Sequence, residues 1–490
     1  MPDRPAPSSR RRPLLLLAVL VAAAALLLPP AAAQRAASAT IDDVATAAAR
    51  AGASGIGDRY FPADGSGGID VTTYDVHVRY DFARGLLAGR TRIVLRTTQA
   101  LRSFGLDLLL PVQAVRVDGR PAGFSKPTRH ELRVRPTRPL AQGRRVVVVV
   151  DYAGRPGELS YLGERNWLAD RREVVTMNQP HMAPWWFPAN DHPSDKARFD
   201  IRVSVPRGRE VVSNGELVRR SVRDGVATSH WRSREPMATY LAFFAAGDFV
   251  VERGRTDGLP WVNAVSAQLP PRVRAGQQRL LRRTPGIVRW LERELGDYPF
   301  RSTGGVVTAL PVYFALENQT RPTYYAGSPD DVSLVVHEQA HQWFGDSVAL
   351  ERWRDIWLNE GLATWLEVRY AETHGGPSGP EWLRDQYASR PAGDPFWRLR
   401  IGDPGAARIF DEAVYVRGAM TAQALRERIG AADFGVLLRR WAATHRHGNA
   451  TGVQFRAMAE QVSGEDLDGF FAAWLDTASR PAPTAANGLG

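Results

Sequence analysis

The sequence of 490 residues contains no cysteine. This absence excludes disulfide bonds, cysteine nucleophiles, iron–sulfur clusters and cysteine-ligated zinc sites. Any metal ion that the protein holds must therefore bind to histidine, aspartate or glutamate side chains. An oxidising compartment would do such a chain no harm.

Lysine is nearly as scarce, since Lys126 and Lys196 are the only two. The formal net charge of +11 therefore comes from arginine. The arginines are scattered along the chain, and no run alternates them with aromatic residues as a nucleic-acid groove requires. We expect no nucleic-acid partner, and we attribute the basicity to codon usage that favours arginine and alanine.

Long apolar runs are also rare, and the longest one lies near the N-terminus. Three arginines at positions 10–12 precede an unbroken apolar stretch from Leu14 to Leu28, and small residues follow at 31–33. This order is typical of a secretory signal peptide, and the stretch is shorter than the ~20 residues that span a bilayer. The sequence predicts a signal peptide over 1–33, a secreted, extracytoplasmic mature protein that begins near Gln34, and no stable membrane span after cleavage. An uncleaved anchor is the alternative.

Strand-like patterns fill the next part of the chain, and helical patterns fill the last part. Residues 71–80 alternate apolar and polar side chains, residues 145–152 form a β-branched run, and turn signals recur about every ten residues. After Gly254 the spacing of apolar residues becomes helical. The pattern predicts an α+β protein in which an antiparallel β domain precedes a mainly helical one. The predicted parts after the signal peptide are a flexible lead-in over 34–57, a β domain over 58–252, a helical catalytic domain over 253–478 and a disordered tail over 479–490.

The segment His337-Glu338-Gln339-Ala340-His341 has the spacing of a metal site on a helix. Residues i and i+4 share one face of a helix, so both imidazoles can contact one ion. Glu338 lies one residue round from His337, where its carboxylate can reach a water molecule at that ion and remove a proton. A chance occurrence on an exposed helix is the alternative, and a third ligand separates the two explanations.

Glu360 is the candidate third ligand. A metzincin would continue with glycine at 344 and histidine at 347, but Phe344 and Ser347 occupy these positions. Glu360 instead lies on a second predicted helix, and a turn between the helices can return its carboxylate to the same ion. Two histidines and one glutamate leave the fourth position of a tetrahedral Zn²⁺ open for water, whose pKa falls to about 7. We predict one Zn²⁺ per chain, bound by His337, His341 and Glu360.

These motifs resemble the core of the aminopeptidase N family of gluzincin zinc metallopeptidases. The segments 337–348 and 353–367 match that core nearly throughout, and the segment 187–197 resembles the family's β-domain signature. The resemblance covers residues 58–478 and implies a β-sandwich or saddle-like N-terminal domain followed by a thermolysin-like catalytic domain. Since the chain ends soon after the predicted catalytic domain, we expect a short, two-domain form that lacks the family's C-terminal helical domain and has a more open site.

The resemblance also implies which residues contact the substrate. Tyr415, in a Tyr-Val-Arg-Gly setting, corresponds to a tyrosine that stabilises the oxyanion, with Arg417 in place of the family's lysine. Glu317 corresponds to the carboxylate that pairs with the free α-ammonium of a peptide. The other implied substrate-binding residues are Gln179, Ala315 and Asn318. The alternatives are a packing aromatic for Tyr415 and a buried polar strand residue for Gln179.

Two further positions leave alternatives open. Phe314 stands where the family has glycine, and a side chain there can block the approach of a substrate backbone. Glu367, two turns after Glu360, is either a carboxylate that orients a zinc histidine or a solvated residue at a helix end.

The sequence thus predicts a secreted zinc aminopeptidase that hydrolyses N-terminal residues from peptides by metal-activated water, with Glu338 as the general base and then the acid. Its expected partners are peptide substrates with a free N-terminus. Phe314 and an open cleft favour one alternative, an endopeptidase or broad-specificity peptidase that uses the same zinc site. A non-catalytic secreted binding protein with the same fold is the other alternative.

Overall fold

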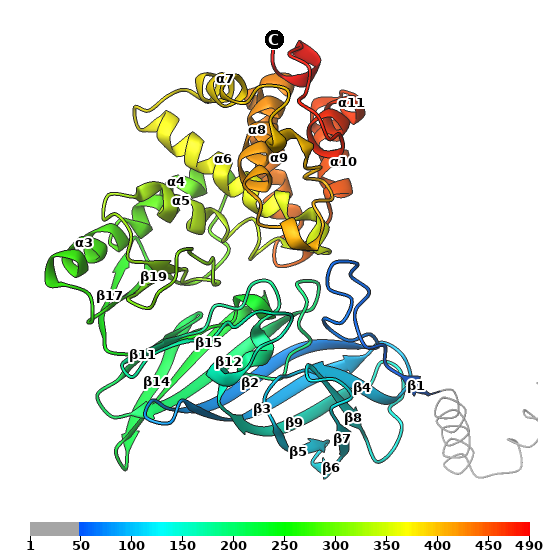
Figure 1. Cartoon of the computed structure of the whole chain (residues 1–490), viewed down its shortest axis with the longest axis vertical. Helices are drawn as coiled ribbons and strands as arrows, with labels where there is room; N and C mark the ends of the chain where they lie inside the picture. Colours follow the sequence, from blue (N-terminus) through cyan, green and yellow to red (C-terminus); the bar gives the residue numbers. More distant parts are fainter. Residues whose placement is uncertain (1–48) are drawn as a thin grey trace, which may run out of the picture.

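The computed structural model of the chain describes residues 49–490. A sheet-rich N-terminal domain and a mainly helical C-terminal domain pack against each other, the helical one at the top of Figure 1. The predicted signal peptide, the predicted mature N-terminus at Gln34 and most of the predicted lead-in lie outside the described residues. Within residues 49–490, no helix combines the length and the apolar character that a membrane crossing needs.

The N-terminal domain is built on an eight-stranded sheet in the order β14-β15-β12-β2-β3-β9-β5-β6. Its strands alternate as the sequence predicts: Tyr74, Val76 and Val78 of β2 are buried, while His77 is exposed. Most neighbours are antiparallel, but β12 and β2 run parallel, so the sheet is mixed and not purely antiparallel. The strands are β2 (Ile69–Asp81), β3 (Leu86–Thr97), β5 (Val112–Val117), β6 (Arg120–Pro121), β9 (Arg145–Gly154), β12 (Lys196–Pro206), β14 (Glu216–Arg223) and β15 (Val226–Ala238).

Two four-stranded sheets, in the orders β1-β4-β8-β7 and β10-β11-β16-β13, complete this domain. Their buried side chains join those of the large sheet in one continuous apolar core. The strands are β1 (Arg50–Ala51), β4 (Leu101–Asp107), β7 (Gly123–Ser125), β8 (Glu131–Arg135), β10 (Leu168–Ala169), β11 (Glu173–Val175), β13 (Glu210–Ser213) and β16 (Phe244–Gly247).

The end of the predicted flexible lead-in is ordered. Arg50 and Ala51 form β1, which pairs with the edge of β4. The segment after β1 reaches the helical domain, where the Asp58 carboxylate accepts a 3.0 Å hydrogen bond from the Trp353 amide and Arg59 forms a 2.8 Å ion pair with Asp403. The prediction of flexibility up to residue 57 is therefore wrong for this stretch, because pairing with a distant edge strand leaves no periodic signal in the local sequence.

The C-terminal domain combines a small sheet with helices. The sheet order is β17-β18-β19-β20, with β18, β19 and β20 parallel, and it begins ahead of the predicted boundary at 253. Its strands are β17 (Phe249–Thr256), β18 (Leu259–Ser266), β19 (Thr303–Thr308) and β20 (Thr323–Tyr325), and a separate short pair is β21 (Ala349–Leu350) with β22 (Asn449–Ala450). The helices are α3 (Pro271–Leu281), α4 (Thr284–Leu295), α5 (Val332–Ala340), α6 (Trp357–Thr373), α7 (Gly379–Ser389), α8 (Glu412–Ile429), α9 (Ala431–Thr444), α10 (Gly452–Ser463) and α11 (Asp468–Phe471).

The predicted disordered tail over 479–490 is also ordered. The Tyr387 hydroxyl of α7 donates a 2.7 Å hydrogen bond to the Pro481 carbonyl, and the Arg480 guanidinium lies 3.6 Å from the centre of the Tyr387 ring. The Trp474 indole donates to the Asn487 carbonyl at 3.1 Å. The prediction is wrong because aromatic side chains from other segments bind the tail, which its own Pro/Ala/Gly composition does not reveal.

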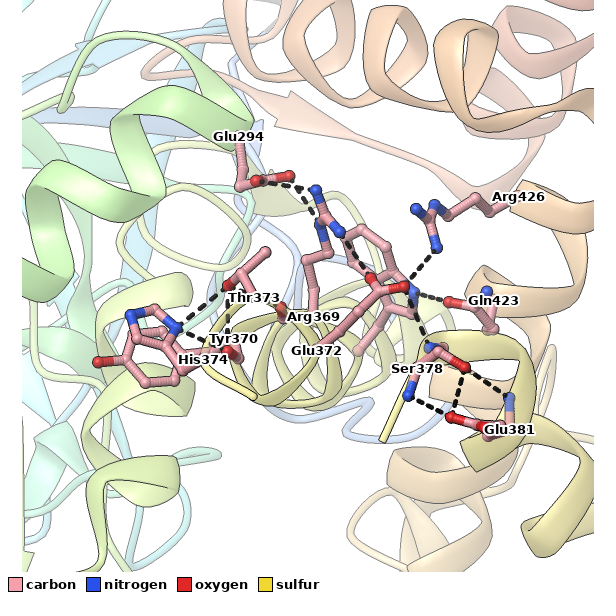
Figure 2. Close-up of polar contacts among 12 residues, drawn as sticks. Glu294, Arg369, Tyr370, Glu372, Thr373, His374, Ser378, Glu381, Gln423 and Arg426 are labelled. Atoms are coloured by element: carbon pink, nitrogen blue, oxygen red, sulfur yellow. Dashed lines mark hydrogen bonds and ion pairs between the residues drawn. The ribbon is translucent and has the colours of Figure 1, made fainter. Parts of the chain in front are cut away.

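Helix α6 is held between two neighbouring helices near its C-terminal end, as Figure 2 shows. Arg369 of α6 forms ion pairs with Glu294 of α4 at 3.2 Å and with Glu372 at 2.6 Å. Glu372 in turn faces Arg426 of α8 at 3.5 Å and accepts the Gly379 amide at 3.2 Å. This network fixes the helix that carries the predicted ligand near its other end.

Candidate metal centre

Helices α5 and α6 bring the three predicted ligands together. The Asp331 carboxylate caps the start of α5 by accepting the Leu334 amide, and the two histidines follow at the end of that helix. The Nε2 atoms of His337 and His341 are 3.0 Å apart. Glu360 Oε2 on α6 lies 3.5 Å from the first of these atoms and 3.3 Å from the second. The three donor atoms converge on one point, as a single zinc ion requires.

The hydrogen bonds of the two rings show which nitrogen atoms are available to a metal. His337 Nδ1 lies 2.7 Å from Glu367 Oε1, and His341 Nδ1 lies 3.0 Å from the carbonyl oxygen of Phe344. A carboxylate and a carbonyl only accept, so both Nδ1 atoms donate, and each neutral ring then carries its lone pair on Nε2. The Nε2 lone pairs of His337 and His341 and the Glu360 carboxylate face one another at about 3 Å, and a shared cation would satisfy all three. A set of two nitrogen ligands and one oxygen ligand suits Zn²⁺. Glu367 therefore has the position of an orienting carboxylate, one of the two alternatives for it.

The charges around these ligands are strongly coupled. Burial alone raises the pKa of Glu360, but the neighbouring His341 and His337 outweigh it and lower that pKa to about 2. Burial lowers the pKa of His341, but the carboxylates of Glu360 and Glu317 raise it to about 9. Glu360 is therefore ionised at neutral pH, and protons compete with a metal ion for the His341 nitrogen.

Glu338 has the position of a proton acceptor beside this centre. Its side chain is 4% exposed and lines the same cleft as the three ligands. Burial raises the pKa of Glu338 to about 8, although His337 and His341 oppose the rise, and a dication on the ligands would lower it again. A carboxylate tuned in this way can take up and return a proton near neutral pH.

Tyr415 reaches the cleft because α6 and α8 cross at two glycines. A Cβ atom added to Gly361 would lie 2.7 Å from the Cα atom of Gly418, and one added to Gly418 would lie equally close to Gly361. The Tyr415 ring of α8 stacks against the His337 ring of α5, with centroids 6.1 Å apart. Burial and the nearby Glu360 carboxylate raise the pKa of Tyr415 well above 10, so its phenol keeps a proton to donate.

Arg417, which replaces the family's lysine, has a structural position. Its side chain is fully buried and donates hydrogen bonds of 2.8 to 3.0 Å to backbone carbonyls of Trp397, Leu399, Ala473 and Thr477. It does not line the cleft. The arginine therefore anchors α8 to the C-terminal segments, which keeps Tyr415 in place.

Glu317 and Gln179 meet across the two domains. Leu316 pairs with Thr323 of β20 through two hydrogen bonds of 2.8 Å. Glu317, the next residue, therefore lies at the edge of the sheet formed by β17, β18, β19 and β20. The Glu317 carboxylate accepts the Gln179 amide at 2.8 Å, and both side chains line the cleft. Asn318 is instead wholly buried and donates to the Thr323 hydroxyl at 2.9 Å. The structure thus brings three of the predicted substrate-binding residues, Gln179, Ala315 and Glu317, to the cleft and leaves Asn318 bracing the turn between Leu316 and Thr323.

A cleft of about 360 Å³ contains the metal ligands and the predicted substrate residues. It is lined by Gln179, Tyr313, Phe314, Ala315, Glu317, Tyr325, Leu334, His337, Glu338, His341, Glu360, Thr364, Glu367 and Tyr415. Phe314 is 53% exposed, and its neighbour Tyr313 is 89% exposed. Tyr313, Tyr325, Leu334 and Thr364 also line the cleft and were not predicted from the sequence. Only Thr364 carried a usable signal, because it lies one helical turn after Glu360 on the same face of α6.

Comparisons with known proteins agree with this arrangement. Residues 71–241 match the Peptidase M1 N-terminal domain, and residues 304–474 match the Peptidase family M1 domain. A leucyl aminopeptidase from Saccharolobus solfataricus is 25% identical over 441 residues, which cover 84% of this chain and 54% of that protein. Aminopeptidase M1-D from Oryza sativa is 25% identical over 83% of this chain and 50% of its own length. The chain therefore spans about half the length of the curated relatives it matches.

Two solved structures match almost from end to end. A two-domain M1 zinc metallopeptidase mutant bound to L-tryptophan has a TM-score of 0.79 and 28% identity, covering 87% of this chain and 99% of that one. An M1 zinc metallopeptidase mutant from Deinococcus radiodurans, bound to a Tyr-Ser-Ala substrate, has a TM-score of 0.78 and 28% identity, covering 88% and 100%. These matches confirm the predicted family resemblance and the predicted order of a sheet-rich and a helical domain. The chain belongs to peptidase family M1.

Proposed function

We propose that the protein is a zinc-dependent aminopeptidase, a hydrolase that removes N-terminal residues from peptides. The observation that carries this proposal is the presence in one cleft of a three-ligand metal site, a buried carboxylate beside it and a second carboxylate at a sheet edge. The similarity to a leucyl aminopeptidase and to a zinc metallopeptidase with a bound tripeptide supports the same activity.

Each residue of the site has a task in hydrolysis. His337, His341 and Glu360 would hold a zinc ion, which would supply Lewis-acid polarisation of the scissile carbonyl and lower the pKa of the attacking water. Glu338 takes a proton from that water as the new C–O bond forms, and it gives the proton to the departing amine as the C–N bond breaks. The Tyr415 phenol donates a hydrogen bond to the oxygen that becomes negatively charged, a contact that strengthens in the transition state.

Glu317 gives the cleft its preference for a free N-terminus. A peptide's α-ammonium presents three N–H donors and one positive charge, and the buried Glu317 carboxylate supplies a charged acceptor. Gln179 holds this carboxylate from the opposite domain at 2.8 Å. An acetylated N-terminus has lost the charge and would leave Glu317 buried without a partner of opposite sign, which costs free energy.

The exposed aromatic residues of the cleft favour a second candidate function, that of an endopeptidase or broad-specificity peptidase. Exposed Phe314 and Tyr313 stand at the mouth of the cleft, where aromatic faces can contact a longer peptide that enters with no free terminus nearby. Mass spectrometry of one peptide, prepared with a free and with an acetylated N-terminus, separates the candidates. We expect stepwise loss of N-terminal residues from the free form alone, and no cleavage after chelation. Equal cleavage of both forms would establish the endopeptidase, and a zinc-loaded protein inert toward both would be a binding protein.

We also propose that the protein is exported from the cytoplasm. The support is the sequence of the first 33 residues, with its arginine cluster and apolar stretch, together with the lack of any cysteine. Edman sequencing of the protein recovered outside its producing cells is expected to start near Gln34. Retention of the whole protein inside the cells would contradict export.

A further inference from the structure

Lys196, at the start of β12, extends from the N-terminal domain to the C-terminal one. Its Nζ atom donates to the carbonyl oxygens of Asp346 at 2.8 Å, Ser347 at 2.8 Å and Gly448 at 3.2 Å. An ammonium group has three N–H donors, so these bonds use all of them. A single side chain of the first domain thus ties together two separate segments of the second.

The first of these segments directly follows the metal-binding end of α5. The carbonyl of Phe344 accepts the hydrogen bond from His341 Nδ1 at 3.0 Å. The amide of Asp346 donates to the carbonyl of His341 at 3.0 Å, and the amide of Ser347 donates to Gln342 at 3.2 Å. The segment 344–348 therefore holds the His341 ring in its tautomer and orientation, and Lys196 holds two of its five carbonyls.

The other segment makes this attachment rigid. Gly448 directly precedes β22, which pairs with β21 just after the segment 344–348. The Asn449 side-chain Nδ2 donates to the carbonyl of Leu350 at 2.9 Å and to that of Pro193, three residues before Lys196, at 2.8 Å. The Lys196 ammonium and Asn449 thus both connect the turn that follows α5 to the segment 193–196 and to β22.

We propose that Lys196 is a positioning residue for the metal centre: by fixing the segment 344–348, it sets the orientation of the His341 imidazole and thereby the affinity for zinc. This role rests on the zinc site of the proposed function. Lys196 touches neither metal nor substrate, and it acts through the carbonyl that His341 uses. Partners that orient a metal-bound histidine typically contribute 10- to 100-fold in metal affinity.

The test compares zinc affinity and metal geometry in the full chain. Lys196→Met removes all three donors while keeping a side chain of similar length. We expect its zinc dissociation constant, measured by competition with a chelator, to rise by about 10-fold or more, and the visible absorption bands of the Co²⁺-loaded protein to change in position or intensity. Asp58→Asn is the matched control, since it removes the charge from another contact between the domains, to Trp353, without touching the segment 344–348. Its zinc affinity and Co²⁺ spectrum should remain those of the wild type even if its stability falls.

Unchanged zinc affinity and an unchanged Co²⁺ spectrum in folded Lys196→Met would overturn the positioning role. Should this variant fail to fold, Lys196→Gln is measured in the same way. Its amide nitrogen is one bond shorter than the lysine side chain and carries two donors in place of three, so it cannot restore the three bonds to Asp346, Ser347 and Gly448, and wild-type zinc affinity there would overturn the role equally. A wild-type chain that binds no zinc would instead refute the proposed function. The two failures are therefore distinguishable.

Discussion

Replacing Glu317 with glutamine tests whether the cleft selects peptides by their free amino group. The carboxylate is 3% exposed and accepts the Gln179 amide at 2.8 Å. Glutamine has the same size and can accept the same hydrogen bond through its own carbonyl, so the variant removes the charge and little else. Truncating one partner of a buried, hydrogen-bonded charge pair costs about 2–5 kcal/mol. Since ~1.4 kcal/mol is a factor of ten, kcat/KM for free peptides should fall by about 30- to 4000-fold.

The assay uses one fluorogenic peptide series in two forms, with free and with acetylated N-termini, and zinc content is measured on the same samples. The loss should be confined to the free form and should appear mainly in KM if the ammonium contact is equally strong in the ground and transition states. Gln179→Ala is the control, because it removes one hydrogen bond and leaves the carboxylate charge in place. A hydrogen bond to a charged group contributes about 1.5–3 kcal/mol, so the loss should be about 150-fold at most and the preference for the free form should remain. An equal loss on both peptide forms, or no loss on the free form, would refute the reasoning.

Three further predictions concern the same architecture. Tyr415→Phe should lower kcat by about 10²–10³-fold with little change in KM or zinc content, and steady-state kinetics with kcat unchanged would rule out the phenol as an oxyanion donor. Gly418→Ala places a methyl group about 2.7 Å from Gly361 and should destabilise the fold by about 1–3 kcal/mol in urea unfolding, a loss whose absence would show that α6 and α8 can separate freely. Burial raises the pKa of Asp58, but hydrogen bonds from His192 and two backbone amides outweigh burial and lower that pKa from 3.8 to about 2. The ionised Asp58 therefore stabilises the fold fully above pH 3.8, and this stabilisation disappears as the pH falls through about 2. Unfolding of wild type and Asp58→Asn from pH 7 to pH 2 should show a stability gap that closes over this window, and a gap that widens in acid would contradict the sign.

The metal ligands could be predicted from the sequence because their geometry is local. The i, i+4 spacing of His337 and His341 fixes both rings on one helix face, and the only unknown was whether a second helix returns Glu360. Glu367 was left with two alternatives, since nothing in its own helix says which ring lies opposite. The 2.7 Å contact with His337 is a property of the packing between α5 and α6.

The features that sequence reasoning missed depend on contacts between distant segments. Gly361 and Gly418 belong to separate motifs, and their close approach becomes visible only when α6 and α8 are packed. The ordered tail is bound by Tyr387 and Trp474 from other elements. Helix α7 differs from these features because it could have been recognised from the sequence alone. Its capping box, Ser378 with Glu381 in Figure 2, is a helix start signal within the local sequence.

The most direct test of the account is a zinc titration of the metal-free protein. Treatment with a chelator should abolish peptide hydrolysis, and added Zn²⁺ should restore it in proportion until about one equivalent per chain is bound. Glu360→Gln, which replaces the charged ligand by a neutral amide, should retain little zinc and little activity under the same conditions. Full hydrolysis by the metal-free chain, or a stoichiometric zinc content in Glu360→Gln, would contradict the account.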